Sequence, residues 1–186
     1  MAQLTLEKAK EILKKHVTEE HLFLHAQAVS AAMGAMAAHF GQDKAHWEAI
    51  GYLHDVDYEK FPAEHCHHVR ELLEGEDIDE ADIRAIISHG WGLCTDEAEP
   101  QSDMEKSLFT VDELTGIVMA YALMRPEKMN GMELKSLKKK FKDKSFAAKC
   151  NREVIKKGFE MLGLEAGVVM QCCIDGMTEY HEALKL

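Results

Sequence analysis

Helical periodicity runs through almost the whole chain, and no other feature restricts its fold so strongly. No segment shows the alternation of apolar and polar residues that is typical of a strand. Apolar residues instead recur every three or four positions, as on one face of a helix. The expected helices cover residues 5–17, 19–40, 43 into 52–61, 62–75, 79–89, 103–124, 151–163 and 164–184. The sequence therefore predicts an all-α fold.

Capping residues mark the expected helix boundaries. Thr5 and Asp43 are good N-caps, and Gly41 is a good C-cap. Pro62 suits the first turn of a helix that ends near Gly75. Residues 90–102 are rich in Gly, Asp, Glu and Pro, which predicts an exposed loop.

Composition predicts a single soluble domain over residues 1–186, with 46% hydrophobic and 30% charged residues. No apolar run approaches the ~20 residues that span a bilayer, so we expect no membrane contact. The N-terminal stretch lacks the apolar segment of a signal peptide. The five cysteines form no CxxC pair, which excludes a zinc ribbon and favours reduced thiols. These features predict a cytoplasmic protein.

Charge is distributed unevenly along the chain. Residues 125–157 contain 12 Lys or Arg against 4 Asp or Glu, a local charge of +8, although the whole chain carries −11. The rest of the chain therefore carries −19. Most lysines of the densest run, 138–144, are expected to face water, as charge runs usually do.

The stretch YLHDVDYEKF at 52–61 places one histidine and several carboxylates at the end of an expected helix. His54, Asp55, Asp57 and Glu59 are costly to desolvate unless a positive charge lies among them. A metal ion would supply that charge.

Two further polar residues stand on apolar helix faces. His25 and Asp112 would each need a partner if they point inward, although a lone histidine in such a place is more often hydrogen-bonded in a core. With His54 and Asp55 they would form a set of two His and two Asp. That mixture suits Mn, Fe, Co or Ni with open water positions better than a closed structural zinc site.

The order of these residues resembles the HD superfamily of metal-dependent phosphohydrolases. The motifs HAQAV, LHDVDYEKFPAEH, AIISHG and DELTG look like those of its small bacterial HDIG-type members, over roughly residues 18–130. The resemblance implies a compact helical HD-domain fold, to which the basic connector and C-terminal helices of residues 131–186 are added. It also implies that His25, His54, Asp55 and Asp112 hold the first metal.

In two-metal members of this superfamily, two more histidines hold a second ion that the HD aspartate bridges. The matching positions are His65 and His89. His68 lies three residues after His65, so either could be the ligand. The resemblance thus implies one or two divalent ions, from Mn, Fe, Co, Ni, Mg or Zn.

Further residues are candidates for roles around the metals. Asp57 could orient a ligand or a metal-bound water, or simply end the helix, and Lys60 could offset phosphate charge or be exposed. Trp91 could form a pocket wall, a mobile lid or a half-buried anchor. Because the ligand-bearing part is acidic, we expect the basic stretch to supply cations for a polyanionic substrate. The candidates are Arg125, Lys144 and Arg152.

The expected activity is hydrolysis of a phosphate ester by metal-activated water, with His54, Asp55, Asp57 and Lys60 in the catalytic group. The resemblance implies a small phosphorylated substrate such as a nucleotide, cyclic nucleotide or alarmone. A catalytically silent HD domain that binds a metal or nucleotide as a sensor or scaffold is the alternative. Nucleic-acid binding is disfavoured by the charge of −11 and by the few aromatic residues near the lysine run.

Overall fold

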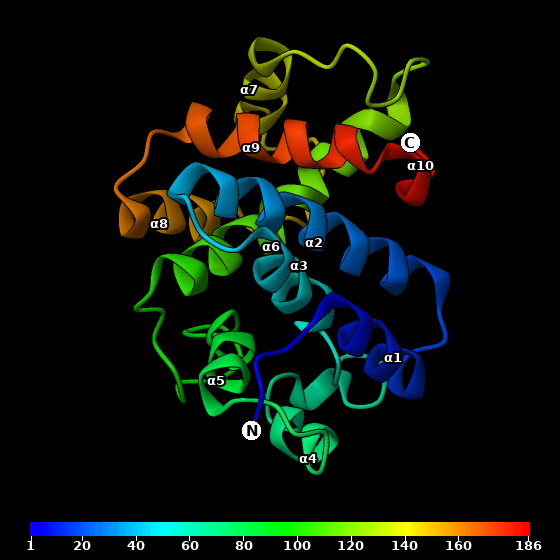
Figure 1. Ribbon diagram of the computed structural model, residues 1–186. Coiled ribbons are helices and arrows are strands. Elements are labelled where there is room, and N and C mark those ends of the chain that lie inside the picture. The colour runs from blue at the N-terminus through cyan, green and yellow to red at the C-terminus, as the bar shows by residue number, and fades with distance from the viewer.

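Ten α-helices and one 3₁₀ helix make up the computed structural model, which describes residues 1–186 (Figure 1). No β-strand is present, only two isolated bridges, and the predicted all-α class is confirmed. The helices are α1 (Leu6–His16), α2 (Glu20–Phe40), α3 (Lys44–Leu53), the 3₁₀ helix η1 (Pro62–Glu64), α4 (Val69–Leu73), α5 (Glu80–Ser88), α6 (Asp103–Met124), α7 (Leu134–Lys142), α8 (Arg152–Leu162), α9 (Ala166–Glu179) and α10 (His181–Leu184).

The caps expected from the sequence are formed. The Thr5 side chain accepts a hydrogen bond from the Lys8 backbone N–H, and Asp43 caps α3 in the same way. Gly41 ends α2 in the left-handed conformation. Local sequence signals therefore set these boundaries.

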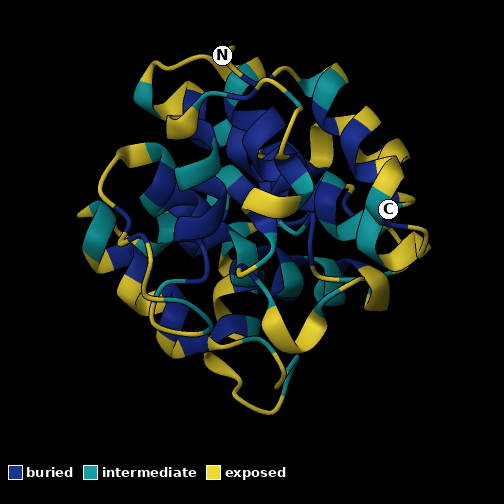
Figure 2. Ribbon diagram, turned by 90° about the horizontal axis from the view of Figure 1, so that it is seen from below, coloured by how far each residue is buried: buried dark blue, intermediate teal, exposed yellow.

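Helix α2 lies at the centre of the fold and packs against α3, α6 and α9 (Figure 1). A single buried cluster of 44 residues joins the N-terminal helices to residues as distant as Ile155, Val169 and Met177. Figure 2 shows these buried segments gathered in the interior, with exposed residues on the peripheral turns. The C-terminal helices therefore complete the core that positions α2 and α6.

Helix α6 is the one helix long and apolar enough to cross a bilayer, judged by length and composition. Its most apolar window has a mean hydropathy of 1.3, and 56% of that window is buried inside the protein. It packs against α2, α8 and α9. Helix α6 therefore serves as a core helix.

The helix predicted from Pro62 to near Gly75 is wrong, because the chain breaks between η1 and α4. Cys66 adopts a φ of 74°, in the left-handed region that side chains other than glycine rarely occupy. The neighbouring His65 and His68 are both tied to the buried carboxylate of Asp57. These polar contacts outweigh the local preference for a helix.

Two other expectations about the C-terminal part need correction. The basic connector contains a helix, α7, whose Leu137 and Phe141 are buried against the core. The helix expected over residues 164–184 is divided at Tyr180 into α9 and α10. The turn lets Leu184 reach the core beside α2.

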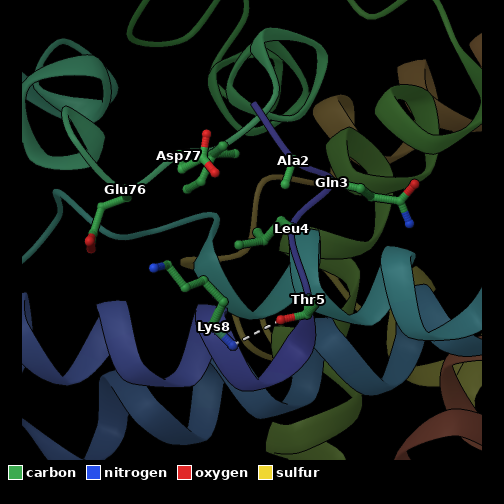
Figure 3. Close-up of a pocket in the computed structure, with 8 residues that line it drawn as sticks. Ala2, Gln3, Leu4, Thr5, Lys8, Glu76 and Asp77 are labelled. Carbon is green, nitrogen blue, oxygen red and sulfur yellow. Dashed lines mark hydrogen bonds between the residues drawn. The ribbon is translucent and has the colours of Figure 1, made fainter.

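The N-terminal segment runs beside residues 76–78, where Ala2 exchanges backbone hydrogen bonds with Asp77 and Asp79. A cavity of about 180 Å³ lies between the two segments, with Lys8 and Glu76 in its lining (Figure 3). None of the candidate metal ligands lines it. This hollow is therefore separate from the site described below.

Candidate metal centre

A first group of polar side chains forms where α2, α3 and α6 meet. His25 lies on α2, His54 caps α3, Asp55 follows it, and Asp112 lies on α6. One ligand atom from each residue lies within 4.8 Å of every other. The four residues selected from the sequence are thus brought together.

The distances within this group fit ligands that surround one ion. His25 Nε2 lies 2.9 Å from Asp112 Oδ1 and 3.2 Å from His54 Nε2. His54 Nε2 lies 3.0 Å from Asp112 Oδ1 and 3.3 Å from Asp55 Oδ2. Ligand atoms about 2.1 Å from one ion are about 3.0 Å apart at a right angle and about 3.4 Å apart at a tetrahedral angle. The group could therefore hold one divalent ion.

Asp55 also contacts a second group, formed by His65 and His89. Its Oδ1 lies 3.1 Å from His65 Nε2 and 3.3 Å from His89 Nε2. The two ring nitrogens are 3.0 Å apart. One carboxylate therefore stands between two pairs of imidazoles, with one oxygen toward each pair.

Three of the imidazoles are oriented through their other ring nitrogen. Nδ1 of His54 lies 2.7 Å from the Gly51 carbonyl, and Nδ1 of His89 lies 2.5 Å from the Ile86 carbonyl. Because a carbonyl only accepts hydrogen bonds, both Nδ1 atoms must donate. In the neutral rings, the lone pair is therefore on Nε2 and points into the cluster. Such contacts are typical of metal-ligating histidines.

Asp57 orients the imidazole ring of His65 by accepting a hydrogen bond from its Nδ1. Its carboxylate is fully buried and accepts hydrogen bonds from His65 Nδ1 at 2.7 Å and from the His68 backbone N–H at 3.1 Å. The His68 ring instead lies between Glu64 and Glu71, 2.7 Å from each carboxylate. Of the two histidines left open by the sequence, His65 therefore joins the cluster and His68 does not.

The cluster strongly favours positive charge. Burial opposes protonation of His25, but the hydrogen bonds that its ring donates to the Asp112 and Asp55 carboxylates outweigh burial and raise the pKa of His25 to about 9. The balance is similar at His65, where Asp55 and Asp57 raise the pKa to about 10. Burial also opposes ionisation of Asp55, yet the imidazoles hold its pKa well below the usual range.

One side of the cluster opens toward solvent. The His54 and His89 side chains are 0% and 2% exposed, whereas His25 is 28% exposed and Asp112 is 21% exposed. The buried imidazoles form the floor, and the partly exposed side chains form the rim. Water or a small molecule can therefore approach the ligand atoms from the rim.

Two charged residues of the 52–61 stretch turn away from the cluster. Lys60 Nζ lies 2.8 Å from His16 Nδ1, on the exposed surface. Glu59 accepts hydrogen bonds from the backbone N–H groups of Thr18 and Glu19, at the start of α2. The structure therefore gives Glu59 a helix-capping contact and gives Lys60 no contact with the ligands.

The basic candidates Arg125 and Arg152 bind backbone carbonyls. Arg125, which donates to the Lys128 and Asn130 carbonyls, is 13 positions after Asp112, or about 20 Å along the helix axis. Arg152 is only 8% exposed and donates to five carbonyls, those of Lys140, Phe141, Asp143, Phe146 and Ala147. Lys144 is exposed after the end of α7. Backbone carbonyls therefore engage Arg125 and Arg152, and the substrate contacts expected of the three residues stay a prediction.

Lys157 and Cys66 make contacts with or beside candidate residues, although neither was selected from the sequence for such a role. Lys157 Nζ, from α8, lies 4.3 Å from the ring centroid of Trp91, which is two residues after His89. The neighbouring Gly158 lets α8 pack closely on α6, because a Cβ there would lie 2.0 Å from the Thr110 hydroxyl. Cys66 Sγ lies 3.9 Å from His89 Nε2. These contacts depend on the tertiary packing of distant segments.

Comparison with family models, curated proteins and solved structures finds no match to this chain. The functional assignment therefore depends on the residues themselves and on their geometry.

We predict that Arg152→Ala destabilises the protein by about 2–4 kcal/mol, because it removes a charged donor and leaves buried carbonyls without partners. Urea unfolding would measure the change. Lys144→Ala is the matched control and should change stability by less than about 0.5 kcal/mol, since Lys144 is exposed. An Arg152→Ala protein as stable as the wild type would contradict the structural role.

Proposed function

We propose that this protein is a metal-dependent phosphohydrolase of the HD superfamily type, acting on a phosphate ester of a nucleotide or another small phosphorylated metabolite. One observation carries the proposal: Asp55 stands between the imidazoles of His25 and His54 on one side and those of His65 and His89 on the other. The arrangement follows the H…HD…D order in the sequence and the two additional histidines.

The ligand set supports a pair of divalent ions with open positions. The first position would have two imidazoles and two carboxylates, from His25, His54, Asp55 and Asp112. The second would have two imidazoles and the shared Asp55. Nitrogen and oxygen ligands of this kind suit Mn, Fe, Co, Ni, Mg or Zn. Two-metal sites of this type support in-line displacement at phosphorus.

When bound, a divalent ion makes water a strong nucleophile near neutral pH and neutralises charge on phosphoryl oxygens. The protein's own contribution would be to fix the ligands. The Gly51 and Ile86 carbonyls hold His54 and His89 in one tautomer, and Asp57 holds His65. Fixed ligands need little reorganisation during the reaction, which favours a polar transition state.

The rim supports binding of a small anion. The partly exposed His25 and Asp112 leave an approach to the ligand atoms. Trp91, two residues after His89, has the Lys157 ammonium over its ring, and we propose that this pair lies within reach of a substrate bound at the cluster. Lys157 belongs to the basic stretch, so it is the member of that stretch that we assign to phosphate binding in place of Arg125, Lys144 and Arg152. An aromatic ring can also stack on a nucleobase.

We predict that the purified protein takes up as many as two divalent ions per chain, and that Asp55→Asn loses both. The substitution keeps the shape of the side chain but removes the charge shared by the two groups. Mn²⁺ titration of metal-free protein with elemental analysis would count the ions. His68→Gln is the matched control, because His68 points to Glu64 and Glu71, and it should retain the wild-type count. A folded Asp55→Asn protein with full metal content would overturn the assignment.

Metal affinity should fall as the solution becomes more acidic. In the metal-free protein the pKa of His25 is about 9 and that of His65 is about 10, so both rings hold protons at neutral pH. A metal must displace these protons, and from pH 9 to 6 the affinity should drop by about tenfold per pH unit for each proton released. Competition against a chelator of known affinity would measure it. A pH-independent affinity would show that these rings are not ligands.

The predicted activity is metal-dependent cleavage of a phosphoester. Turnover would be assayed with Mn, Co, Ni, Fe and Mg across nucleoside mono-, di- and triphosphates, cyclic nucleotides and an aryl phosphate. We expect chelation to abolish turnover and Asp55→Asn to reduce it by about 100-fold or more, with His68→Gln as the active control. If no phosphoester is cleaved with any metal, while a nucleotide raises the melting temperature, the protein is a binding module instead.

A further inference from the structure

Two thiols from distant segments meet beside the second ligand group. Cys94 Sγ lies 3.6 Å from Cys66 Sγ, and Cys66 Sγ is 3.9 Å from His89 Nε2. Both cysteines are free. A disulfide requires a separation of about 2.05 Å, so the sulfur atoms need to approach by only about 1.5 Å.

The missing side chain of Gly90 makes room for this contact. A Cβ built on Gly90 would lie 2.6 Å from Cys66 Sγ and 2.6 Å from Cys94 Sγ, closer than the atoms can approach. The Gly90 carbonyl also accepts the backbone N–H groups of Cys94 and Thr95, which closes the turn after His89. The turn therefore holds Cys94 against Cys66.

The two thiols differ in their access to solvent. Cys66 is 2% exposed, whereas Cys94 is partly exposed and follows Leu93, which is 52% exposed. A small oxidant can therefore reach Cys94 first, with Cys66 in place behind it. A reachable thiol with a second thiol in contact is the arrangement of a redox-sensitive pair.

We propose that Cys66 and Cys94 form a modification site, a dithiol that a peroxide converts to a disulfide and that thereby weakens metal binding by His65 and His89. The disulfide itself does not depend on the function proposed above, but the effect on the metal does.

One molecule of hydrogen peroxide is enough to convert the two thiols to a disulfide. Sulfur of Cys94 attacks a peroxide oxygen, the O–O bond breaks, and Cys94 becomes a sulfenic acid as one water leaves. Sulfur of Cys66 then attacks Cys94 sulfur, the S–S bond forms and the S–O bond breaks, and a second water leaves. Two thiols lose two electrons and two protons in total, and hydrogen peroxide is reduced to two waters. A dithiol reductant reverses the change.

The disulfide would join the two segments that carry the second ligand group. Cys66 directly follows His65 and has a φ of 74°, and Cys94 closes the turn that follows His89. Moving the sulfur atoms together shifts Cys66 Sγ relative to His89 Nε2 and pulls on a strained backbone. Because displacement of a ligand's supporting contacts typically lowers metal affinity by about 10–100-fold, a loss of that size is expected at the second position. The first group shares only Asp55 with it and keeps its own histidines.

The first test counts thiols in metal-free, full-length protein treated with one equivalent of hydrogen peroxide. Free thiols should fall from five to three, the mass should drop by two hydrogens, and a peptide linking Cys66 to Cys94 should appear. Cys66→Ser and Cys94→Ser should each prevent the link. Cys172→Ser is the matched control on α9 and should retain it. An unchanged thiol count, or a link through another cysteine, would overturn the proposal.

The second test titrates Zn²⁺ into reduced, oxidised and re-reduced protein. We expect one of two binding steps to lose about 10–100-fold in affinity on oxidation and to recover on reduction, while the other step keeps its affinity. Equal binding in all three forms would refute the effect on the metal. If the reduced protein binds no ion at all, the proposed metal function fails and the metal effect fails with it, whereas the thiol count still decides whether the dithiol forms a disulfide.

Discussion

The site depends on the contacts between the Asp55 carboxylate and four imidazole rings. Each of its oxygens lies 3.1–3.3 Å from two imidazole nitrogens, so four histidines from different segments converge on one charge. Imidazoles held this close repel one another unless protons or metal ions lie among them, and buried charges are stable only when paired. The raised pKa values of His25 and His65 and the lowered pKa of Asp55 are the two sides of this single balance.

The rest of the fold fixes the positions of the four histidines around Asp55. Helix α2, enclosed by α3, α6 and α9, positions His25, and backbone carbonyls at the ends of α3 and α5 set the tautomers of His54 and His89. The buried Asp57 then fixes His65, and it does so at the cost of an interrupted helix and a left-handed Cys66. Strained backbone of this kind persists where surrounding contacts over-determine it, and such places are often functional.

Sequence reasoning succeeded where local signals were strong and failed where tertiary contacts decide the structure. Thr5, Gly41 and Asp43 end or begin helices as their types predict, and the order of histidines and aspartates selected the residues that converge. The prediction of a helix from Pro62 to near Gly75 did not account for the hydrogen bonds that tie His65 and His68 to Asp57. The structural role of Arg152 was missed for a related reason, because nothing in the local sequence reveals five carbonyls that converge on one guanidinium.

The two ligand groups differ in chemistry although they share Asp55. The first contains only nitrogen and oxygen ligand atoms, whereas the second has the sulfur of Cys66 at 3.9 Å from His89 Nε2. A thiol that gives up its proton to a bound ion favours metals such as Zn, whereas carboxylates favour harder ions such as Mg and Mn, so the two positions would differ in the metals they prefer. The same sulfur is the part of the centre that chemical oxidation can change. In the proposed metal centre, metal preference and sensitivity to oxidants would thus be linked at the second position, while the first position would share only Asp55 with it.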